Sequence, residues 1–255
     1  MNIAVLGLGE AGSAIARDLV AAGADVRGYD PRVPSVDGVD PRDDEADAVR
    51  DADVVLSVNS SHDAMTALEH ALPALRPGTL WADLNTASPG LKAALARTAG
   101  ERAAVVDVAL MAPVPGKGLR TPMLVSGEAA GRYAELMAPL GAEVTVQPGA
   151  AGAAIGRKLL RSVFYKGLAA AVVEALTAAD AAGCAEWLRG NISAELAGFD
   201  DRTIDRLVEG TRTHARRRAD EMAAATEQLE ELGVRPRISA AARDLLIELR
   251  DTGAG

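Results

Sequence analysis

The sequence is poor in aromatic residues and in basic charge, and both shortages narrow what the chain can be. Only 3% of its 255 residues are aromatic, so the core must consist mainly of Ala, Leu and Val, small side chains that let helices pack closely. The formal net charge is −9, which argues against a nucleic-acid partner because phosphate binding needs a basic face. The densest basic stretch, Arg216-Arg217-Arg218, is followed by Asp220 and Glu221, a pattern typical of a solvated helix face.

Cysteine, histidine clusters and long apolar runs are also lacking. The single cysteine, Cys184, excludes an intrachain disulfide, as expected in a reducing cytoplasm. His62, His70 and His214 lie far apart without metal-ligand spacing, so no metal site is predicted. No apolar run approaches the ~20 residues needed to span a bilayer, and the N-terminus begins a strand without the features of a signal peptide. We therefore expect a cytoplasmic protein with no membrane partner.

Residues 1 to about 150 alternate between short apolar strands and amphipathic segments of helical length. Several strands are apolar throughout, as expected where helices cover both faces of a sheet. The alternation predicts an α/β, Rossmann-type, doubly wound sheet that is mostly parallel. The helices include Ala11 to Ala22 and Asp63 to Leu75, the second of which stops at Pro77-Gly78. The predicted strands are 3–6, 25–29, 54–58, 79–82, 104–108, 123–125 and 143–146.

The pattern changes near Pro148-Gly149. Residues 151 to about 182 contain no proline, and their apolar residues recur at helical spacing, which predicts one helix of about 45 Å. Further helical stretches follow at 184–197, 201–232 and 239–250, with Asp200 and Ser239 as N-caps and Gly233 as a C-terminal stop. We therefore predict a Rossmann domain at 1–150 and an all-α domain at 151–255 that begins with this long interdomain helix.

Gly7-Leu8-Gly9-Glu10-Ala11-Gly12 is the strongest ligand motif, because it follows an apolar strand and opens a helix. In this G-x-G-x-x-G pattern the first glycine permits a tight turn, the second lets a pyrophosphate approach, and the third lets the helix pack on the sheet. The helix N-terminus offers free N–H groups to the phosphates. We assign all six residues to a dinucleotide site, and the alternative is an ordinary glycine turn.

Asp30 stands at the end of the second predicted strand, directly after Tyr29 and 18 residues after Gly12. A carboxylate there can accept hydrogen bonds from both ribose hydroxyls of NAD and would repel the 2′-phosphate of NADP. Arg32 could instead hold that phosphate, so we expect NAD and leave NADP possible. Asn59, which follows the third predicted strand, is also assigned to the cofactor site.

Lys158, in the first turns of the long predicted helix, is the candidate for proton transfer. A lysine can take a hydroxyl proton as hydride leaves, provided that burial or a neighbouring cation keeps part of its amine neutral. Ser162 and Tyr165 follow one and two turns later, and with Lys166 at the edge they share one helix face. The alternative is an ordinary exposed lysine.

Two loops follow predicted strands, where parallel sheets bind ligands. In Asp83-Leu84-Asn85-Thr86-Ala87-Ser88-Pro89, Asn85 and Thr86 are candidates for hydrogen bonds to a substrate carboxylate or hydroxyl. The alternative, left open, is a helix N-cap turn with Ser88 as the cap. In Pro113-Val114-Pro115-Gly116-Lys117-Gly118, backbone N–H groups are candidates for contacts with an anion.

Taken in order, these motifs resemble those of the β-hydroxyacid dehydrogenase family, which includes 3-hydroxyisobutyrate and 6-phosphogluconate dehydrogenases. The family's G-x-G-x-x-G matches residues 7–12, and its D-x-S-T-x-x-P resembles residues 83–89 with Asn85 in place of serine. Its P-V-S-G-G loop resembles residues 113–116. Its G-x-x-G-x-G-x-x-x-K-x-x-x-N motif is matched by Gly149, Gly152 and Lys158, with Ala154 and Ser162 as departures. The resemblance spans residues 1 to about 166, and the helical C-terminal domain is short for the family.

The resemblance implies a nicotinamide-dependent oxidoreductase with Lys158 as general acid/base. It implies a substrate site formed by Asn85, Thr86, Pro115 and Gly116, to which we add Ser162 and Lys166. It also implies a homodimer formed through the C-terminal helices.

We therefore predict hydride transfer between NAD or NADP and a small hydroxy acid or related alcohol. Imine reduction is one alternative, because imine reductases resemble the same family but usually carry Asp or Tyr at the lysine position. The other alternative is a non-catalytic dinucleotide-binding sensor.

Overall fold

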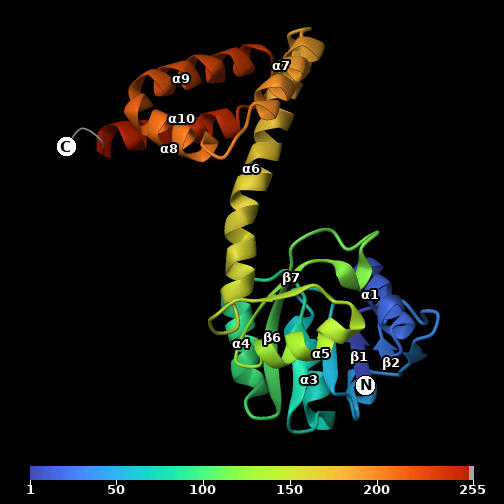
Figure 1. The fold of residues 1–255 in the computed structure, drawn as a ribbon. Coiled ribbons are helices and arrows are strands. Elements are labelled where there is room, and N and C mark those ends of the chain that lie inside the picture. The colour runs from blue at the N-terminus through green and yellow to red at the C-terminus, as the bar shows by residue number, and fades with distance from the viewer. Residues whose placement is uncertain (253–255) are drawn as a thin grey trace. The chain divides into compact units, whose positions relative to one another are not determined.

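The computed structural model describes residues 1–252, and its N-terminal part is built on one eight-stranded sheet (Figure 1). The strands are β1 (Asn2–Leu6), β2 (Asp25–Tyr29), β3 (Asp40–Pro41), β4 (Val54–Ser57), β5 (Thr79–Asp83), β6 (Ala103–Leu110), β7 (Met123–Ser126) and β8 (Val144–Val146). Their order is β3-β2-β1-β4-β5-β6-β7-β8. Neighbours pair in parallel except β6 and β7, which are antiparallel. This confirms the predicted α/β, mostly parallel sheet.

Helices cover both faces of the sheet, and each face has its own apolar core. Helices α1 (Glu10–Ala21) and α5 (Ala130–Met137) bury Ile15, Leu19 and Tyr133 against one face. Helices α2 (Glu45–Val49), α3 (Ala64–Ala71) and α4 (Pro89–Ala99) bury side chains such as Leu68 and Leu95 against the other. Neighbouring residues of one strand contribute to opposite cores, which explains why these strands are apolar along their whole length.

The short elements differ most from the sequence-based expectation. The helix predicted from Asp63 to Leu75 ends at Ala71 and continues as a 3-10 turn over Leu72–Ala74, where Pro73 cannot donate a backbone hydrogen bond. Strand β3 and helices α2 and α5 were not predicted, because two to eight residues give too little periodicity to recognise.

The long helix α6 spans Ala153–Ala181 and belongs to two compact units. The first unit is Met1–Arg161, and the second begins at Ser162, so the division falls inside the helix. The predicted domain boundary, near residue 150, precedes the helix. Its first turn nevertheless packs with the sheet, where Ala154 and Ile155 form a buried cluster with Ala109 of β6.

The second unit is helical, as predicted. After the rest of α6 it contains α7 (Ala185–Ala197), α8 (Thr203–Thr213), α9 (Ala215–Glu231) and α10 (Ile238–Thr252). The prediction of one helical stretch over 201–232 was wrong, because the backbone leaves the helical region at His214. This break lets both α8 and α9 contact α10, and Figure 1 shows α9 beside α10. Within residues 1–252, no helix has the length and apolar character that crossing a bilayer demands.

Glu174 of α6 caps the start of α10. Its carboxylate accepts the backbone N–H groups of Arg237 and Ser239 at 2.6 and 2.8 Å and that of Ile238 at 2.8 Å. Burial opposes the charged form, but these backbone hydrogen bonds outweigh it and hold the pKa of Glu174 below its ordinary value. Ser239 is therefore not the N-cap that the sequence suggested, since the cap comes from a different helix.

Candidate functional site

The glycine loop between β1 and α1 has the shape of a phosphate cradle. Gly7 has a φ of +95°, and a Cβ there would lie 2.7 Å from backbone atoms of Val58 and Asn59. A Cβ on Gly12 would lie 1.8 Å from the carbonyl oxygen of Gly7, so only glycine lets the helix approach the loop this closely. A Cβ on Gly9 would meet nothing within 4 Å, so this position opens onto free space.

The first turn of α1 adds donors to this cradle. Gly9 is the N-cap, and no side chain caps the helix. The N–H groups of the first turn therefore face the space beside Gly9 with the positive end of the helix dipole. An anion such as a pyrophosphate fits both features, and the cradle thus fits a dinucleotide.

Asp30 supports the glycine loop in addition to any role toward a ribose. One carboxylate oxygen accepts the N–H of Leu8 at 2.8 Å, and the other accepts the N–H groups of Arg32 and Val33 at 2.8 and 3.2 Å. A carboxylate has further acceptor positions, so these bonds leave room for ribose hydroxyls. A cleft is lined by Asp30 and Arg32 together with Gly7, Gly9 and Asn59, which brings most of the predicted cofactor residues together.

This cleft has a negative electrostatic character. It is also lined by Tyr29 and Glu45. Burial raises the pKa of the Tyr29 hydroxyl above its ordinary value, and the carboxylates of Glu45, Asp44 and Asp30 raise it further. The same carboxylates would disfavour a further anionic group of a bound dinucleotide, beyond its pyrophosphate, in this cleft.

Lys158 lies in the second turn of α6, at the carboxyl edge of the sheet. Its Nζ donates a hydrogen bond to Thr86 Oγ1 at 2.9 Å, although the two residues are far apart in sequence. Arg161 lies one turn further along α6 and donates from Nη1 to the backbone oxygen of Met111 at 2.9 Å. Two basic side chains of one helix therefore contact the loops that follow β5 and β6.

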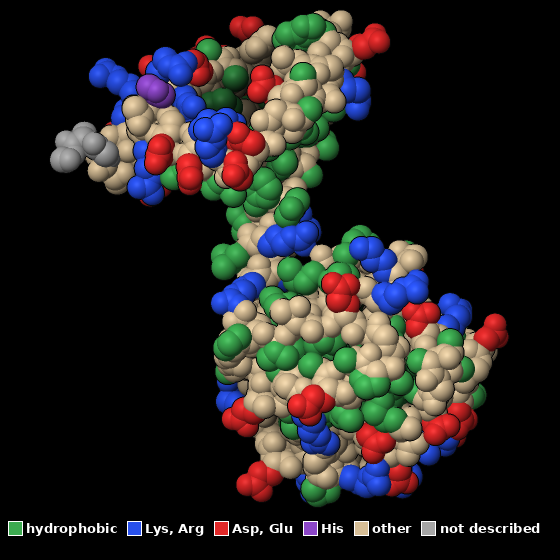
Figure 2. Space-filling model, viewed as in Figure 1, with side chains coloured by type: hydrophobic (Ala, Val, Ile, Leu, Met, Phe, Trp, Pro, Cys, Tyr) green, Lys and Arg blue, Asp and Glu red, His purple; other side chains and the backbone are tan. Residues whose placement is uncertain are grey.

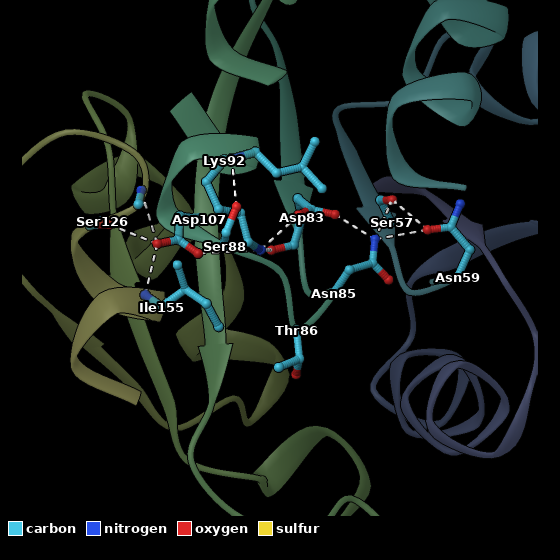
Figure 3. A network of polar contacts seen from close by, with 12 residues as sticks. Ser57, Asn59, Asp83, Asn85, Thr86, Ser88, Lys92, Asp107, Ser126 and Ile155 are labelled. Carbon is cyan, nitrogen blue, oxygen red and sulfur yellow. Dashed lines mark hydrogen bonds and ion pairs between the residues drawn. The ribbon is translucent and has the colours of Figure 1, made fainter. Parts of the chain in front are cut away.

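Asn85 is buried directly beside Thr86. Its Nδ2 lies 2.8 Å from Asn59 Oδ1, 3.1 Å from Ser57 Oγ and 2.5 Å from Asp83 Oδ1 (Figure 3). The amide thus links the end of β5 to the end of β4, and through Asn59 it links the predicted substrate loop to the cofactor cleft. Ser88 is also the N-cap of α4, since its Oγ accepts the N–H of Leu91. The two interpretations of residues 83–89 that the sequence left open, a substrate loop and a helix N-cap turn, are therefore compatible.

A fully buried ion triad lies behind Asn85, and sequence reasoning did not find it. Lys92 Nζ lies 2.7 Å from Asp83 Oδ2 and 3.3 Å from Asp107 Oδ1, and all three side chains are 0% exposed (Figure 3). Lys92 also donates to the backbone oxygen of Asp83 at 2.6 Å. Lys92 comes from α4, Asp83 is the last residue of β5, and Asp107 lies within the neighbouring strand β6, where it pairs with Asp83.

The loop after β6 is anchored on α1. Asp18 accepts the N–H of Leu119 at 2.8 Å, and a Cβ on Gly118 would lie 2.0 Å from the Asp18 carboxylate. The N–H groups of Lys117 and Gly118 already bond to the oxygen of Val114. These two groups are engaged within the turn itself. Pro115 and Gly116 are exposed at the tip of this loop.

The segments around Lys158 carry no acidic side chains, although the whole chain has a net charge of −9. The sequence has no Asp or Glu between Asp83 and Glu101, between Asp107 and Glu128, or between Glu143 and Glu174. These are the loops after β5 and β6 and the first half of α6. Local charge near Lys158 is therefore positive, which favours an anionic ligand there.

Other singled-out residues lie away from this edge or in the second unit. Ser162 and Lys166 belong to the second unit, and their assignment to the substrate site stays a prediction. Arg217 pairs with Glu221 on the exposed face of α9, in agreement with a solvated basic stretch. Among residues 1–252, no group of His, Cys, Asp and Glu could hold a metal ion.

Comparisons with solved structures agree with this fold. A conserved hypothetical protein from Sinorhizobium meliloti 1021 is 32% identical, with 97% of this chain and 87% of that chain covered and a TM-score of 0.64. A conserved protein of unknown function, described as structurally similar to 3-hydroxyacid dehydrogenases, is 27% identical over all of both chains, with a TM-score of 0.65. An imine reductase from Myxococcus stipitatus in complex with NADP+ is 18% identical over 100% of this chain and 96% of that chain, with a TM-score of 0.81. No curated protein gives a significant match.

Family models match both parts of the sequence. Residues 179–249 match a model described as a domain of unknown function (DUF1932). Residues 2–146, more than half of the chain, match the model of the NAD binding domain of 6-phosphogluconate dehydrogenase. That match covers the glycine cradle, Asp30 and the Asp83–Pro89 loop. The chain therefore belongs to the family defined by the NAD binding domain of 6-phosphogluconate dehydrogenase, and its N-terminal part is an NAD(P)-binding domain.

Proposed function

We propose that the protein is an oxidoreductase that transfers hydride between a nicotinamide cofactor and a small hydroxy acid, with Lys158 as general acid/base. One observation carries the proposal. The Lys158 amine bonds to Thr86 on the same carboxyl edge of the sheet as the glycine cradle, and ligands of open α/β sheets bind at this edge.

In this proposal Lys158 handles the proton of the substrate hydroxyl. A bound nicotinamide cofactor would supply the chemistry of taking two electrons and one hydrogen from the carbinol carbon. Lys158 accepts the hydroxyl proton, so the C–OH group becomes C=O and charge does not build up on its oxygen. Thr86 holds the amine at 2.9 Å and so limits its rotamers. In the reverse direction Lys158 returns the proton to the oxygen.

The positive charge near Lys158 supports a carboxylate as the second recognition group of the substrate. Arg161 lies one turn from Lys158 and donates to the backbone oxygen of Met111 in the loop after β6. A guanidinium can bind a carboxylate with two parallel hydrogen bonds. Residues 84–100 and 108–127 contain no acidic side chain to compete with it. A small hydroxy acid therefore fits better than an uncharged alcohol.

We expect NADH to bind at least about fivefold more tightly than NADPH, because Asp30 and Glu45 surround the cleft beside Arg32. Fluorescence titration of the free protein with each cofactor measures this. Asp30→Asn should weaken NADH binding, while Arg32→Ala should weaken only NADPH. The cofactor-bound protein is then screened against 2- and 3-hydroxy acids, with cyclic imines as a second panel, by absorbance at the reduced-nicotinamide band. Binding of neither cofactor at sub-millimolar concentration would end the proposal.

Turnover decides among the alternatives. Oxidation of hydroxy acids supports the proposal, and reduction of imines alone would replace it with imine reductase activity. Cofactor binding with no turnover on either panel would favour the sensor. The likeness to the Myxococcus stipitatus imine reductase concerns the fold and favours none of these outcomes.

We also propose a homodimer, because α6 exposes large apolar side chains. Leu160 is 74% exposed, Val163 73% and Val173 65%, and Figure 2 shows hydrophobic side chains along this helix. Large apolar side chains this exposed are typical of protein–protein interfaces. Sedimentation analysis should give about twice the 26.2 kDa of one chain, and Val163→Asp should shift the mass toward the monomer. A monomeric wild-type protein at micromolar concentration would contradict the dimer.

A further inference from the structure

The buried triad of Lys92, Asp83 and Asp107 is costly for a protein to maintain. Removing three charges from water costs several kcal/mol per ion, and such groups are often replaceable by apolar side chains without loss of stability. All three side chains are 0% exposed. Stability alone is therefore a weak explanation for this triad. Its contacts with the site explain it better.

Asp107 connects the triad to the start of α6. Its Oδ2 accepts the N–H groups of Gly152 at 3.1 Å and Ile155 at 2.9 Å, while its Oδ1 faces Lys92 (Figure 3). Ser126 donates to the same Oδ2 at 3.2 Å and accepts the N–H of Ala154 at 2.9 Å. The first turn of α6, which orients Lys158 in the next turn, is thus fixed by a carboxylate that Lys92 holds.

Asp83 connects the triad to the other half of the site. Its Oδ2 faces Lys92, and its Oδ1 lies 2.5 Å from the Nδ2 of Asn85. The chain then continues directly to Thr86, which accepts the hydrogen bond from Lys158. Lys92 therefore sits between two carboxylates, each of which uses its second oxygen to fix one side of the Lys158–Thr86 contact.

We infer that Lys92 is a positioning residue. Through Asp83 and Asp107 it fixes the position of the Asn85–Thr86 loop relative to the first turn of α6, so that the amine of Lys158 meets Thr86. This inference rests on the proposed function, in which Lys158 is the acid/base. Lys92 itself is 0% exposed, so its side chain is not placed to contact substrate or cofactor. A positioning error of about 1 Å at such a site can cost a hundredfold in rate.

The test compares two buried substitutions on α4. Lys92→Met keeps an unbranched side chain of similar length but removes the charge, whereas Leu95→Ala, one turn later, removes packing only. Leu95 is also 0% exposed and lies in the apolar core of that face. Both variants should lower the temperature of thermal unfolding, so Leu95→Ala controls for lost stability. Measurements are made well below the unfolding range of either variant.

Amide hydrogen exchange reports the geometry without any substrate. In Lys92→Met, exchange at Gly152 and Ile155 should accelerate at least tenfold more than at reference amides in β1, whereas Leu95→Ala should change both sets alike. Selective 15N-lysine labelling gives a second readout, because the chain has only four lysines, Lys92, Lys117, Lys158 and Lys166. The Nζ signal of Lys158 should shift in Lys92→Met and stay in place in Leu95→Ala.

Kinetics separate this inference from the proposed function. With a substrate found in the panel, Lys92→Met should lower kcat at least tenfold and leave the NADH dissociation constant within twofold, while Leu95→Ala keeps kcat. If Lys92→Met does not fold, Ser126→Ala is the milder variant and should accelerate exchange at Ala154 and lower kcat severalfold. If the folded Lys92→Met variant keeps wild-type exchange rates at the start of α6 and wild-type kcat, the inference is overturned. If Lys158→Met keeps activity, the proposed function fails, whereas the exchange result still decides whether Lys92 sets the geometry.

Discussion

Replacing Lys158 with methionine is expected to lower kcat by about a thousandfold, the middle of the range for losing a general acid/base. The NADH dissociation constant should change less than about twofold, because the glycine cradle and Asp30 come from other elements. The measurement is kcat with a hydroxy acid from the panel, together with fluorescence titration of the cofactor. Thr86 loses only its partner, so the fold should remain intact.

Two further substitutions separate proton transfer from simple charge. Lys158→Arg keeps a cation but cannot release a proton near neutral pH, so it should be nearly as inactive as the methionine variant. Lys158→Ala should recover part of its activity when small primary amines are added. Arg157→Met, a neighbouring exposed cation of α6, is the matched control and should keep kcat. If Lys158→Arg stays within tenfold of the wild type, Lys158 acts through its charge and not as an acid/base.

Gly12→Ala is expected to disrupt the dinucleotide domain, with a loss of about 3 kcal/mol or more in the free energy of unfolding. Its Cβ would lie 1.8 Å from the backbone oxygen of Gly7, and backbone cannot move aside as a flexible side chain can. Either α1 moves off the sheet or the turn at Gly7 opens, and both abolish the cradle. Thermal or urea unfolding gives the stability, and NADH titration gives the binding.

Gly9→Ala is the matched variant, because its Cβ would meet nothing within 4 Å. Its φ of −62° is open to any residue, so stability without cofactor should stay within about 1 kcal/mol of the wild type. NADH affinity should still fall at least about tenfold, since the methyl group occupies the approach of the pyrophosphate. Wild-type affinity in Gly9→Ala would show that the phosphates bind elsewhere.

The central fold could be predicted because its signals are local. Each of β1, β4 and β5 is an apolar run that is buried on both faces, and the glycines after β1 have one stereochemical explanation. The break at His214 could not be predicted, because residues 201–232 favour helix throughout. Only packing against α10 stabilises two shorter helices in place of one long one. Helix propensity is weaker than such tertiary contacts.

Only part of the site could be predicted from the sequence, because its supporting contacts are non-local. The order of motifs singled out Lys158 and Thr86, but nothing local indicated that the amine and the hydroxyl lie 2.9 Å apart. Lys92 was not among the predicted site residues. A signal existed: it shares an apolar stripe with Leu95, and the neighbouring buried strands β5 and β6 carry Asp83 and Asp107 in register. A lysine on a buried stripe facing two strand carboxylates indicates an internal ion cluster.

Glu174 ties the last helix of the chain to a position on α6 that precedes it by more than sixty residues. Helices usually carry their own N-terminal cap, and can then be exchanged between related proteins as independent pieces. Here, a chimera that takes α10 from this chain must also take the glutamate, and the connection from Gly233 to Arg237 must keep its length. The smallest transferable piece of the second unit is therefore a set of helices that includes part of α6.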